Sequence, residues 1–156
     1  MHDLRAAPFS LTYDTLVRAK VLARNARGWS IASDANTAGA RIEVEPSAVT
    51  APVRGVLTGP DQLDINWSSL VTPDDGGSAV LSYHLQYDDG TAASTWTDVI
   101  GLAPDSLLTT VIVSSGVISG TEYGFRVRAR NIFGWGPYST VVYIQAAREP
   151  DVPIAP

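Results

Sequence analysis

The feature that most constrains the fold is an internal repeat close to the length of a whole domain. Residues 17–29 align without a gap to residues 123–135 and share Val, Ala, Arg, Asn, Gly and Trp at matching positions. The offset between Asn25 and Asn131 is 106 residues, and Ser33 matches Ser139 at the same offset. A repeat of this length indicates tandem domains, because solenoid units are only about 20–50 residues long.

Both copies alternate apolar and polar residues up to an Asn-x-x-Gly-Trp sequence. This pattern is typical of a half-buried strand that runs into a turn. In the second copy we expect one face to carry Tyr123, Phe125, Val127 and Ala129, and the opposite face Arg126, Arg128 and Arg130.

The sequence predicts a complete set of strands around the second copy only. Gly, Pro and Asp turn signals separate seven strand-like runs, the number found in a constant-type β-sandwich. These runs are residues 53–57, 63–68, 81–87, 95–100, 107–113, 123–130 and 138–145. About 16 residues precede the first copy, with one strand-like run at 9–13, so we expect only the last three strands of a preceding module.

Proline-flanked segments suggest the domain boundaries. We expect the C-terminal part of one module over residues 1–46, a linker over 47–52 and a complete module over 53–147. Residues 148–156 have the same proline-rich character and predict a linker toward a following module.

The order of these motifs resembles the fibronectin type III family. Trp67 lies in the second predicted strand, where that family buries a tryptophan between its sheets, and residues 118–123 resemble its tyrosine corner. The run from Tyr123 to Ser139 is similar to a motif of the family, whereas Val17 replaces the corner tyrosine in the first copy. The resemblance covers residues 50–147 as a whole module and about 8–46 as a part. It implies an all-β, immunoglobulin-like seven-stranded sandwich preceded by a partial sandwich module.

The alternation of apolar and polar residues along the predicted strands indicates a hydrophobic core. We expect this core to be large enough to stabilise the module without disulfides. Each buried large side chain contributes about 1.5–3 kcal/mol. The predicted core residues are Trp67, Tyr83, Leu85, Tyr87, Trp96, Leu107, Val111, Tyr123, Phe125 and Val127.

The three strand arginines are followed by segments that resemble the tryptophan–serine box of cytokine receptors, at residues 134–139 and 28–33. In that family the tryptophan lies between strand guanidinium groups. One interpretation is a stack that stiffens the sheet. The other is a partner-binding face, because Arg, Trp and Tyr are common interface anchors. Its residues would be Arg126, Arg128, Arg130, Trp135 and Tyr138.

Composition argues against several function classes. The net charge is −5, with +1 over residues 1–46 and −6 over 47–156, and no concentrated basic stripe suggests nucleic-acid binding. The chain has no cysteine, no apolar run of about 18 residues for direct membrane insertion, and no apolar leader after Met1. Neither His84, placed on the polar side of its strand, nor His2 has an acidic or hydroxyl partner at motif spacing, so we expect no catalytic residues.

No cofactor or metal site is expected either. Two acidic turns, at residues 74–77 and 88–90, are interpreted as turn chemistry, with a weak calcium site as the alternative. Asn66 begins an Asn-Trp-Ser triplet, which makes it a candidate glycosylation site on an outward-facing strand position.

These observations favour a non-enzymatic structural or protein-interaction segment of a large multi-module surface or extracellular filament protein. The alternatives are a receptor-type module that recognises a protein or glycan through residues 73–79 and 115–120, and an accessory domain of a secreted hydrolase. Expected partners are other proteins or neighbouring modules, including self-association or strand donation at the incomplete first module. We expect an extracellular or cell-surface location, although intracellular arrays of this family leave that alternative open.

Overall fold

The chain forms two compact units, Met1–Val44 and Glu45–Pro156, and the computed structural model describes residues 4–147. All elements of regular structure in the described residues are strands. Residues 148–156, predicted as a linker, lie outside the described range.

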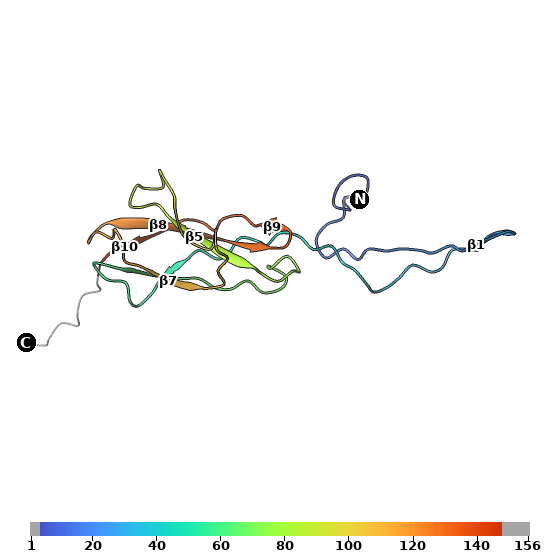
Figure 1. Ribbon diagram of the computed structural model, residues 1–156, viewed down its shortest axis with the longest axis horizontal. Helices are drawn as coiled ribbons and strands as arrows, with labels where there is room; N and C mark the ends of the chain where they lie inside the picture. The colour runs from blue at the N-terminus through green and yellow to red at the C-terminus, as the bar shows by residue number, and fades with distance from the viewer. Residues whose placement is uncertain (1–3, 148–156) are drawn as a thin grey trace, which may run out of the picture. The chain divides into compact units, whose positions relative to one another are not determined.

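The second unit is a sandwich of two antiparallel sheets, seen as two layers in Figure 1. One sheet has the order β10-β8-β5-β6, with β9 paired to β8, and the other has the order β3-β4-β7. The strands of the first sheet are β5 (Ser82–Tyr87), β6 (Thr97–Ile100), β8 (Glu122–Asn131), β9 (Gly134–Trp135) and β10 (Val142–Gln145). Those of the second are β3 (Val53–Arg54), β4 (Leu63–Asn66) and β7 (Thr110–Val113). Each of the seven predicted runs overlaps one strand, β9 is additional, and the predicted all-β sandwich is confirmed.

The core lies between the two sheets because alternate residues of each strand point inward. Leu63 and Ile65 of β4 are fully buried, as are Phe125 and Val127 of β8. Trp67 is 6% exposed and packs edge-on against Tyr83, with ring centroids 6.3 Å apart, so its predicted burial is confirmed.

The tyrosine corner is also present. The Tyr123 hydroxyl accepts a hydrogen bond from the Ile118 amide at 2.8 Å and donates one to the Gly116 carbonyl at 3.3 Å. These two bonds tie the loop before β8 to the strand that carries most of the core, as the motif at residues 118–123 predicts.

Two residues of the predicted core are not in it. Leu107 is 62% exposed, because β7 begins only at Thr110 and Leu107 lies in the preceding loop. Trp96 is half-buried outside the core and contacts an arginine on the outer face of its sheet. Conversely, Val49 lies within the predicted linker 47–52 but is buried in the core of the second unit.

The first unit contains a long antiparallel hairpin over residues 15–42, here called the first-unit hairpin. Its arms are joined by the Leu16–Arg41 bridge and, at the tip labelled β1 in Figure 1, by the pairing of β1 (Arg24–Asn25) with β2 (Gly28–Trp29).

The repeat found in the sequence is also a repeat of hydrogen bonds. The Ser33 hydroxyl accepts from the Val21 amide at 3.0 Å, and the Ser139 hydroxyl accepts from the Val127 amide at 3.1 Å. In the two turns, Asn25 and Asn131 each accept from the amide two residues later, at 2.8 and 2.9 Å. Because local sequence specifies these bonds, the two copies fold alike over this hairpin.

The two copies differ in burial. Among the described residues of the first unit, the only buried hydrophobic side chain is Ile42, whereas the matching hairpin of the second unit supplies much of the core. The described first unit is therefore a hairpin and not a sandwich. The partial preceding module remains a prediction.

Candidate functional site

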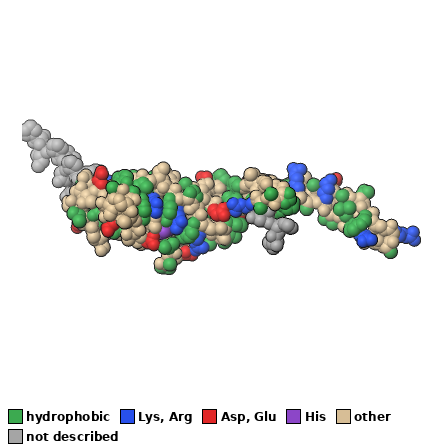
Figure 2. Space-filling model, turned by 90° about the horizontal axis from the view of Figure 1, so that it is seen from above, with side chains coloured by type: hydrophobic (Ala, Val, Ile, Leu, Met, Phe, Trp, Pro, Cys, Tyr) green, Lys and Arg blue, Asp and Glu red, His purple; other side chains and the backbone are tan. Residues whose placement is uncertain are grey.

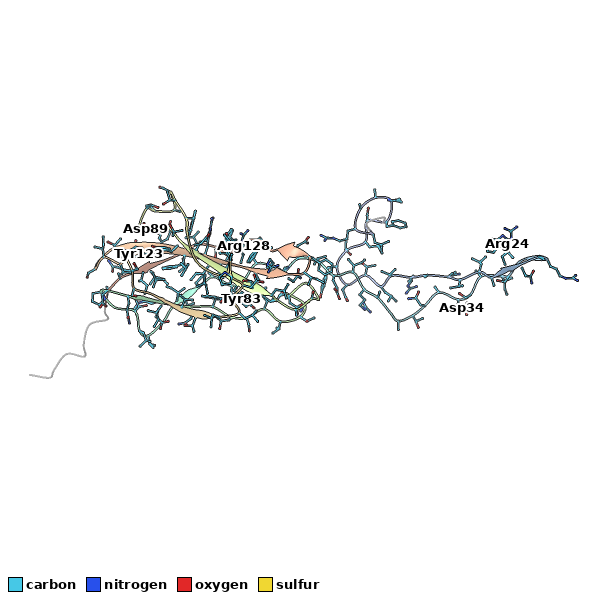
Figure 3. All side chains as sticks on the ribbon, in the orientation of Figure 1. Arg24, Asp34, Tyr83, Asp89, Tyr123 and Arg128 are labelled. Atoms are coloured by element: carbon cyan, nitrogen blue, oxygen red, sulfur yellow. The ribbon has the colours of Figure 1, made fainter. Side chains whose placement is uncertain are left out.

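The outer face of β8 carries the three arginines that the alternation predicts. Arg126, Arg128 and Arg130 are each half-buried, while the intervening Val127 and Ala129 are fully buried. Side chains two residues apart on a strand share a face, so the three guanidinium groups form a row over this sheet. Arg128, at the middle of the row, is labelled in Figure 3.

Aromatic rings separate the guanidinium groups. The Arg126 guanidinium carbon lies 3.9 Å from the Trp96 ring centroid and 4.1 Å from that of Tyr138. The Arg128 carbon lies 4.4 Å from Tyr138 and 4.7 Å from Trp135, and Arg130 lies 5.5 Å from Trp135. We call this stack the arginine–aromatic ladder, in the order Trp96, Arg126, Tyr138, Arg128, Trp135 and Arg130.

The β8–β9 turn brings Trp135 back over β8. Asn131 caps the turn, and Trp135 pairs with Arg130. Beyond β9, Ser139 bonds Val127 through both its amide and its hydroxyl, at 2.8 and 3.1 Å. These bonds hold the segment that contains Tyr138 against β8. Trp96 arrives separately, from the loop before β6.

Polar partners on β5 and in a loop hold the guanidinium groups in place. Arg126 donates twice to Gln86 Oε1, at 2.9 and 2.7 Å. Arg130 donates to Asp105. Each cation–π contact contributes about 0.5–1 kcal/mol at an exposed site and about 2 kcal/mol when desolvated. The ladder therefore fixes side chains that would otherwise move freely.

His84 lies under the ladder. Its Nε2 is 2.7 Å from Asp98 Oδ1, and its Nδ1 lies 3.2 Å both from Arg128 Nε and from the Tyr138 hydroxyl. The arginine can only donate, so Nδ1 is the acceptor and Nε2 carries the proton that Asp98 accepts. Figure 2 shows Lys and Arg side chains in blue on the surface of the protein.

The sequence placed His84 on the polar side of its strand, and the structure agrees, because His84 lies opposite Arg128. The sequence showed no acidic or hydroxyl partner at motif spacing, and the surroundings of this side chain were therefore missed. The side chain is fully buried, because the rings of Trp135 and Tyr138 cover it at 5.5 and 5.9 Å. It also has acidic and hydroxyl partners, Asp98 and Tyr138, which pairing between distant segments brings to it. A signal for these contacts was present in the sequence of β5, whose alternating polar residues lie directly opposite the arginines of β8. These residues are Ser82, His84 and Gln86.

Burial lowers the pKa of His84 below its usual 6.5. The hydrogen bond and charge of Asp98 oppose this effect, and the charges of Arg128 and Arg126 add to it. The hydrogen bond from Gln86 lowers the pKa of Asp98, burial raises it, and the bond and charge of His84 lower it further, as does the charge of Arg128.

This histidine predicts a pH-dependent stability. Between its lowered pKa and 6.5 the unfolded chain binds more protons than the folded chain, so stability is highest above pH 6.5 and falls as the pH drops through this window. The proton would have to enter at Nδ1, against the Arg128 donor. The contribution of Asp98 is lost only below pH 3.8, outside this window.

Urea unfolding between pH 5 and pH 8 measures the effect. We expect His84→Gln to flatten the dependence and His2→Gln to preserve it. An unchanged slope in His84→Gln would contradict the assignment.

The acidic turns have structural roles. Asp88 is fully buried, and its carboxylate accepts the amides of Gly90, Ala93 and Gly124 at 2.7–3.0 Å. Asp75 accepts the amide of Gly77 at 2.8 Å. Among residues 4–147, no group of three or more His, Cys, Asp or Glu residues is placed to hold a metal ion.

Asn66 ends β4 and is half-buried. If Gly55 had a Cβ, this atom would lie 2.4 Å from the side-chain nitrogen of Asn66. The Asn66 amide therefore packs against the backbone at Gly55. Its use as a glycosylation site stays a prediction. None of the described residues form a helix able to cross a bilayer.

Sequence comparison finds a family match within the second unit and two relatives that match over part of the chain. Residues 47–145 match the family model "Fibronectin type III domain". Ephrin type-B receptor 2 of Coturnix japonica and of Gallus gallus are each 33% identical over 107 residues, which is 69% of this chain and 10% of those proteins. The chain thus spans about a tenth of the length of these relatives.

Solved structures have the same fold. Domains A168–A170 of titin match with a TM-score of 0.54 and 22% identity, over 81% of this chain and 39% of that one. The sixth fibronectin type III domain of human fibronectin type III domain containing protein 3 matches with a TM-score of 0.55 and 17% identity, over 77% of this chain and all of that one.

The match at residues 47–145, together with the two-sheet topology and the tyrosine corner, supports a protein-interaction module. The chain belongs to the fibronectin type III domain family.

Proposed function

We propose that this chain is a non-enzymatic interaction segment of a multi-module protein and that the arginine–aromatic ladder is its partner-binding face. The observation that carries the proposal is the stack of Arg126, Arg128 and Arg130 with Trp135 and Tyr138 on the outer face of the sheet. These residue types are enriched at binding hot spots.

Preorganisation supports this assignment. Binding usually costs about 0.5–1.5 kcal/mol for each flexible side chain that becomes fixed. Here Gln86, His84 and Asp105 already hold the three guanidinium groups, so a partner would meet an ordered surface. The acceptors of Arg126 and Arg128 on β5 are neutral side chains, which leaves positive charge for a carboxylate on the partner.

The location that best fits this role is the cell surface or an extracellular filament. The relatives named ephrin type-B receptor 2 favour the cell surface, because their name describes them as receptors. The same relatives favour a second candidate, a receptor-type module that reads its ligand through residues 73–79 and 115–120. Ile118, in the second of these loops, is 67% exposed.

The proposal is tested with a fluorescent glutamate-rich peptide that contains tyrosine, titrated into the full chain at about 0.15 M salt. We expect Arg128→Ala to weaken binding about tenfold, because it removes one charge and opens the stack. Arg27→Ala is the matched control, since it removes the same charge at the tip of the first-unit hairpin.

Melting curves accompany the titration, so that binding is compared only where both variants are folded. Equal weakening by the two variants would show a net-charge effect and would count against the ladder. Weakening by Ile118→Ala, with Arg128→Ala unchanged, would favour the loop-based receptor candidate.

A further inference from the structure

The arginine–aromatic ladder contains one arginine whose hydrogen-bond acceptor can change its charge. Arg128 donates from Nε to His84 Nδ1 at 3.2 Å. The proton of Nε2 is directed to Asp98, so Nδ1 is the nitrogen that a second proton would occupy. The neighbouring Arg126 donates instead to Gln86 Oε1, at 2.9 and 2.7 Å, and an amide oxygen does not titrate at these pH values. The two arginines are therefore expected to respond differently to acid.

A second proton would change Nδ1 from an acceptor into a donor. Arg128 has only donors, so its hydrogen bond would be replaced by an approach of two N–H groups and two positive charges. The Tyr138 hydroxyl also lies 3.2 Å from Nδ1, and a hydroxyl can either donate or accept. It would accept from the protonated ring without moving. Protonation thus opposes the position of Arg128 and preserves that of Tyr138.

Charged groups on the surrounding elements decide where the protonated ring finds its counter-charge. On β6, Asp98 lies 2.7 Å from Nε2 and would stabilise an imidazolium ion. On β8, the charges of Arg128 and Arg126 oppose it. The loop before β7 contributes Asp105, which pairs with Arg130. The protonated ring would therefore form an ion pair with Asp98, on the side away from Arg128.

Burial determines which of the two side chains can move. His84 is fully buried under the rings of Trp135 and Tyr138, at 5.5 and 5.9 Å. Its backbone is also confined, because a Cβ at Gly101 would lie only 3.2 Å from the His84 Cα. Arg128 is half-buried on the outer face of the sheet. The arginine can therefore move into solvent, whereas the histidine cannot.

We propose that His84 is a proton-controlled switch for the ladder. When Nδ1 is protonated, Arg128 leaves its position between Tyr138 and Trp135, and the face loses its central cation. The effect on partner binding rests on the proposed function of the ladder, but the movement of Arg128 does not. Because coupling is reciprocal, a partner that holds Arg128 in place would oppose protonation of the ring.

The direction of the switch follows from the surroundings of the ring. Burial lowers the pKa of His84 below 6.5, the bond and charge of Asp98 oppose this effect, and Arg128 and Arg126 add to it. The neutral ring therefore predominates at pH 6.5 and above, where the ladder is complete. Arg128 would be released only at lower pH, as the folded chain takes up the proton.

Nuclear magnetic resonance of the full chain labelled with ¹⁵N tests the movement directly. The ring nitrogens of His84 and the Nε–H groups of Arg126 and Arg128 are followed from about pH 8 to about pH 5. We expect the hydrogen-exchange rate of Arg128 Nε–H, divided by that of Arg126 Nε–H, to rise at least tenfold as Nδ1 is protonated. Arg126 is the internal control, because its acceptor is Gln86 and the ratio cancels the intrinsic pH dependence of exchange.

Two variants identify the groups responsible. Tyr138→Phe retains a ring in the stack but removes the hydroxyl that would accept from protonated Nδ1, so the step should move to lower pH. His84→Gln removes the titrating group, and the exchange ratio should then not change with pH.

A binding measurement connects the switch to the proposed function. The glutamate-rich peptide is titrated into the full chain and into His84→Gln at about pH 7.5 and about pH 5.5. We expect acid to weaken binding to the native chain about fivefold more than binding to the variant, since titration of the peptide itself affects both equally. If the peptide binds at neither pH while the exchange ratio rises, the proposed function fails and the switch is supported.

Two results would overturn the switch. One is a constant exchange ratio while Nδ1 of His84 becomes protonated, because Arg128 would then keep its place beside a charged ring. The other is a ring that stays neutral down to the pH at which the chain unfolds.

Discussion

Gly101→Ala is expected to lower the free energy of unfolding of the second unit by about 4 kcal/mol. Gly101 follows β6 and passes directly against β5. A Cβ at this position would lie 1.7 Å from the Tyr83 carbonyl oxygen and 3.2 Å from the His84 Cα. Its φ of +84° adds strain for any residue with a side chain. Both neighbouring atoms belong to the backbone of a buried strand, so the clash is relieved only by separating β5 from β6.

Gly116→Ala separates the two causes. Gly116 has a similar φ of +74°, but nothing lies within 4 Å of its Cβ position. Gly116→Ala should therefore lower the free energy of unfolding only by the cost of the positive φ, roughly 1–2 kcal/mol. Urea unfolding followed by tryptophan fluorescence compares the two variants. An equal decrease in the free energy of unfolding for both variants would mean that the close approach of Gly101 to β5 does not affect stability.

Phe125→Ala is expected to cost about 3–5 kcal/mol, the second large effect. Phe125 is fully buried at the centre of β8, and its ring stacks on that of Tyr87 with centroids 6.1 Å apart. Removing the ring leaves a cavity between two sheets that cannot easily collapse, because hydrogen bonds to β5 and β10 hold β8 on both sides.

Phe133→Ala is the matched control, since Phe133 is 42% exposed in the β8–β9 turn. We expect a loss below about 1 kcal/mol. Both variants are measured by urea unfolding with the slope m held common. A loss below 1 kcal/mol for Phe125→Ala would contradict the central place of β8 in the core.

The strands of the second unit were predictable because their signal is local. The alternation in β8 placed Phe125 and Val127 inward and the arginines outward, and the structure agrees. Residues 118–123 resemble a tyrosine corner, and the hydroxyl bonds of Tyr123 to the preceding loop confirm it. Both depend on a few adjacent residues, where strand period and turn chemistry act directly.

The errors have the opposite origin. Trp96 was placed in the core because a large aromatic residue in a strand-like run usually faces inward. The strand begins only at Thr97, and Trp96 instead lies 3.9 Å from the guanidinium carbon of Arg126. His84 was left without a partner because Asp98 and Tyr138 are distant in sequence. No short motif contains these contacts.

The sequence by itself determined the all-β class, the seven strands of the second unit, its tyrosine corner and the 106-residue repeat, because each is specified by residues close together in the chain. Only the tertiary structure decided which polar faces meet. The register of β5 against β8 sets His84 opposite Arg128 and brings Asp98, Trp96 and Tyr138 around them. The tertiary structure also distinguishes two hairpins that have the same local hydrogen bonds. One is buried in a sandwich, and the other is largely exposed. Burial depends on what packs against a strand, and a strand's own residues do not specify that neighbour.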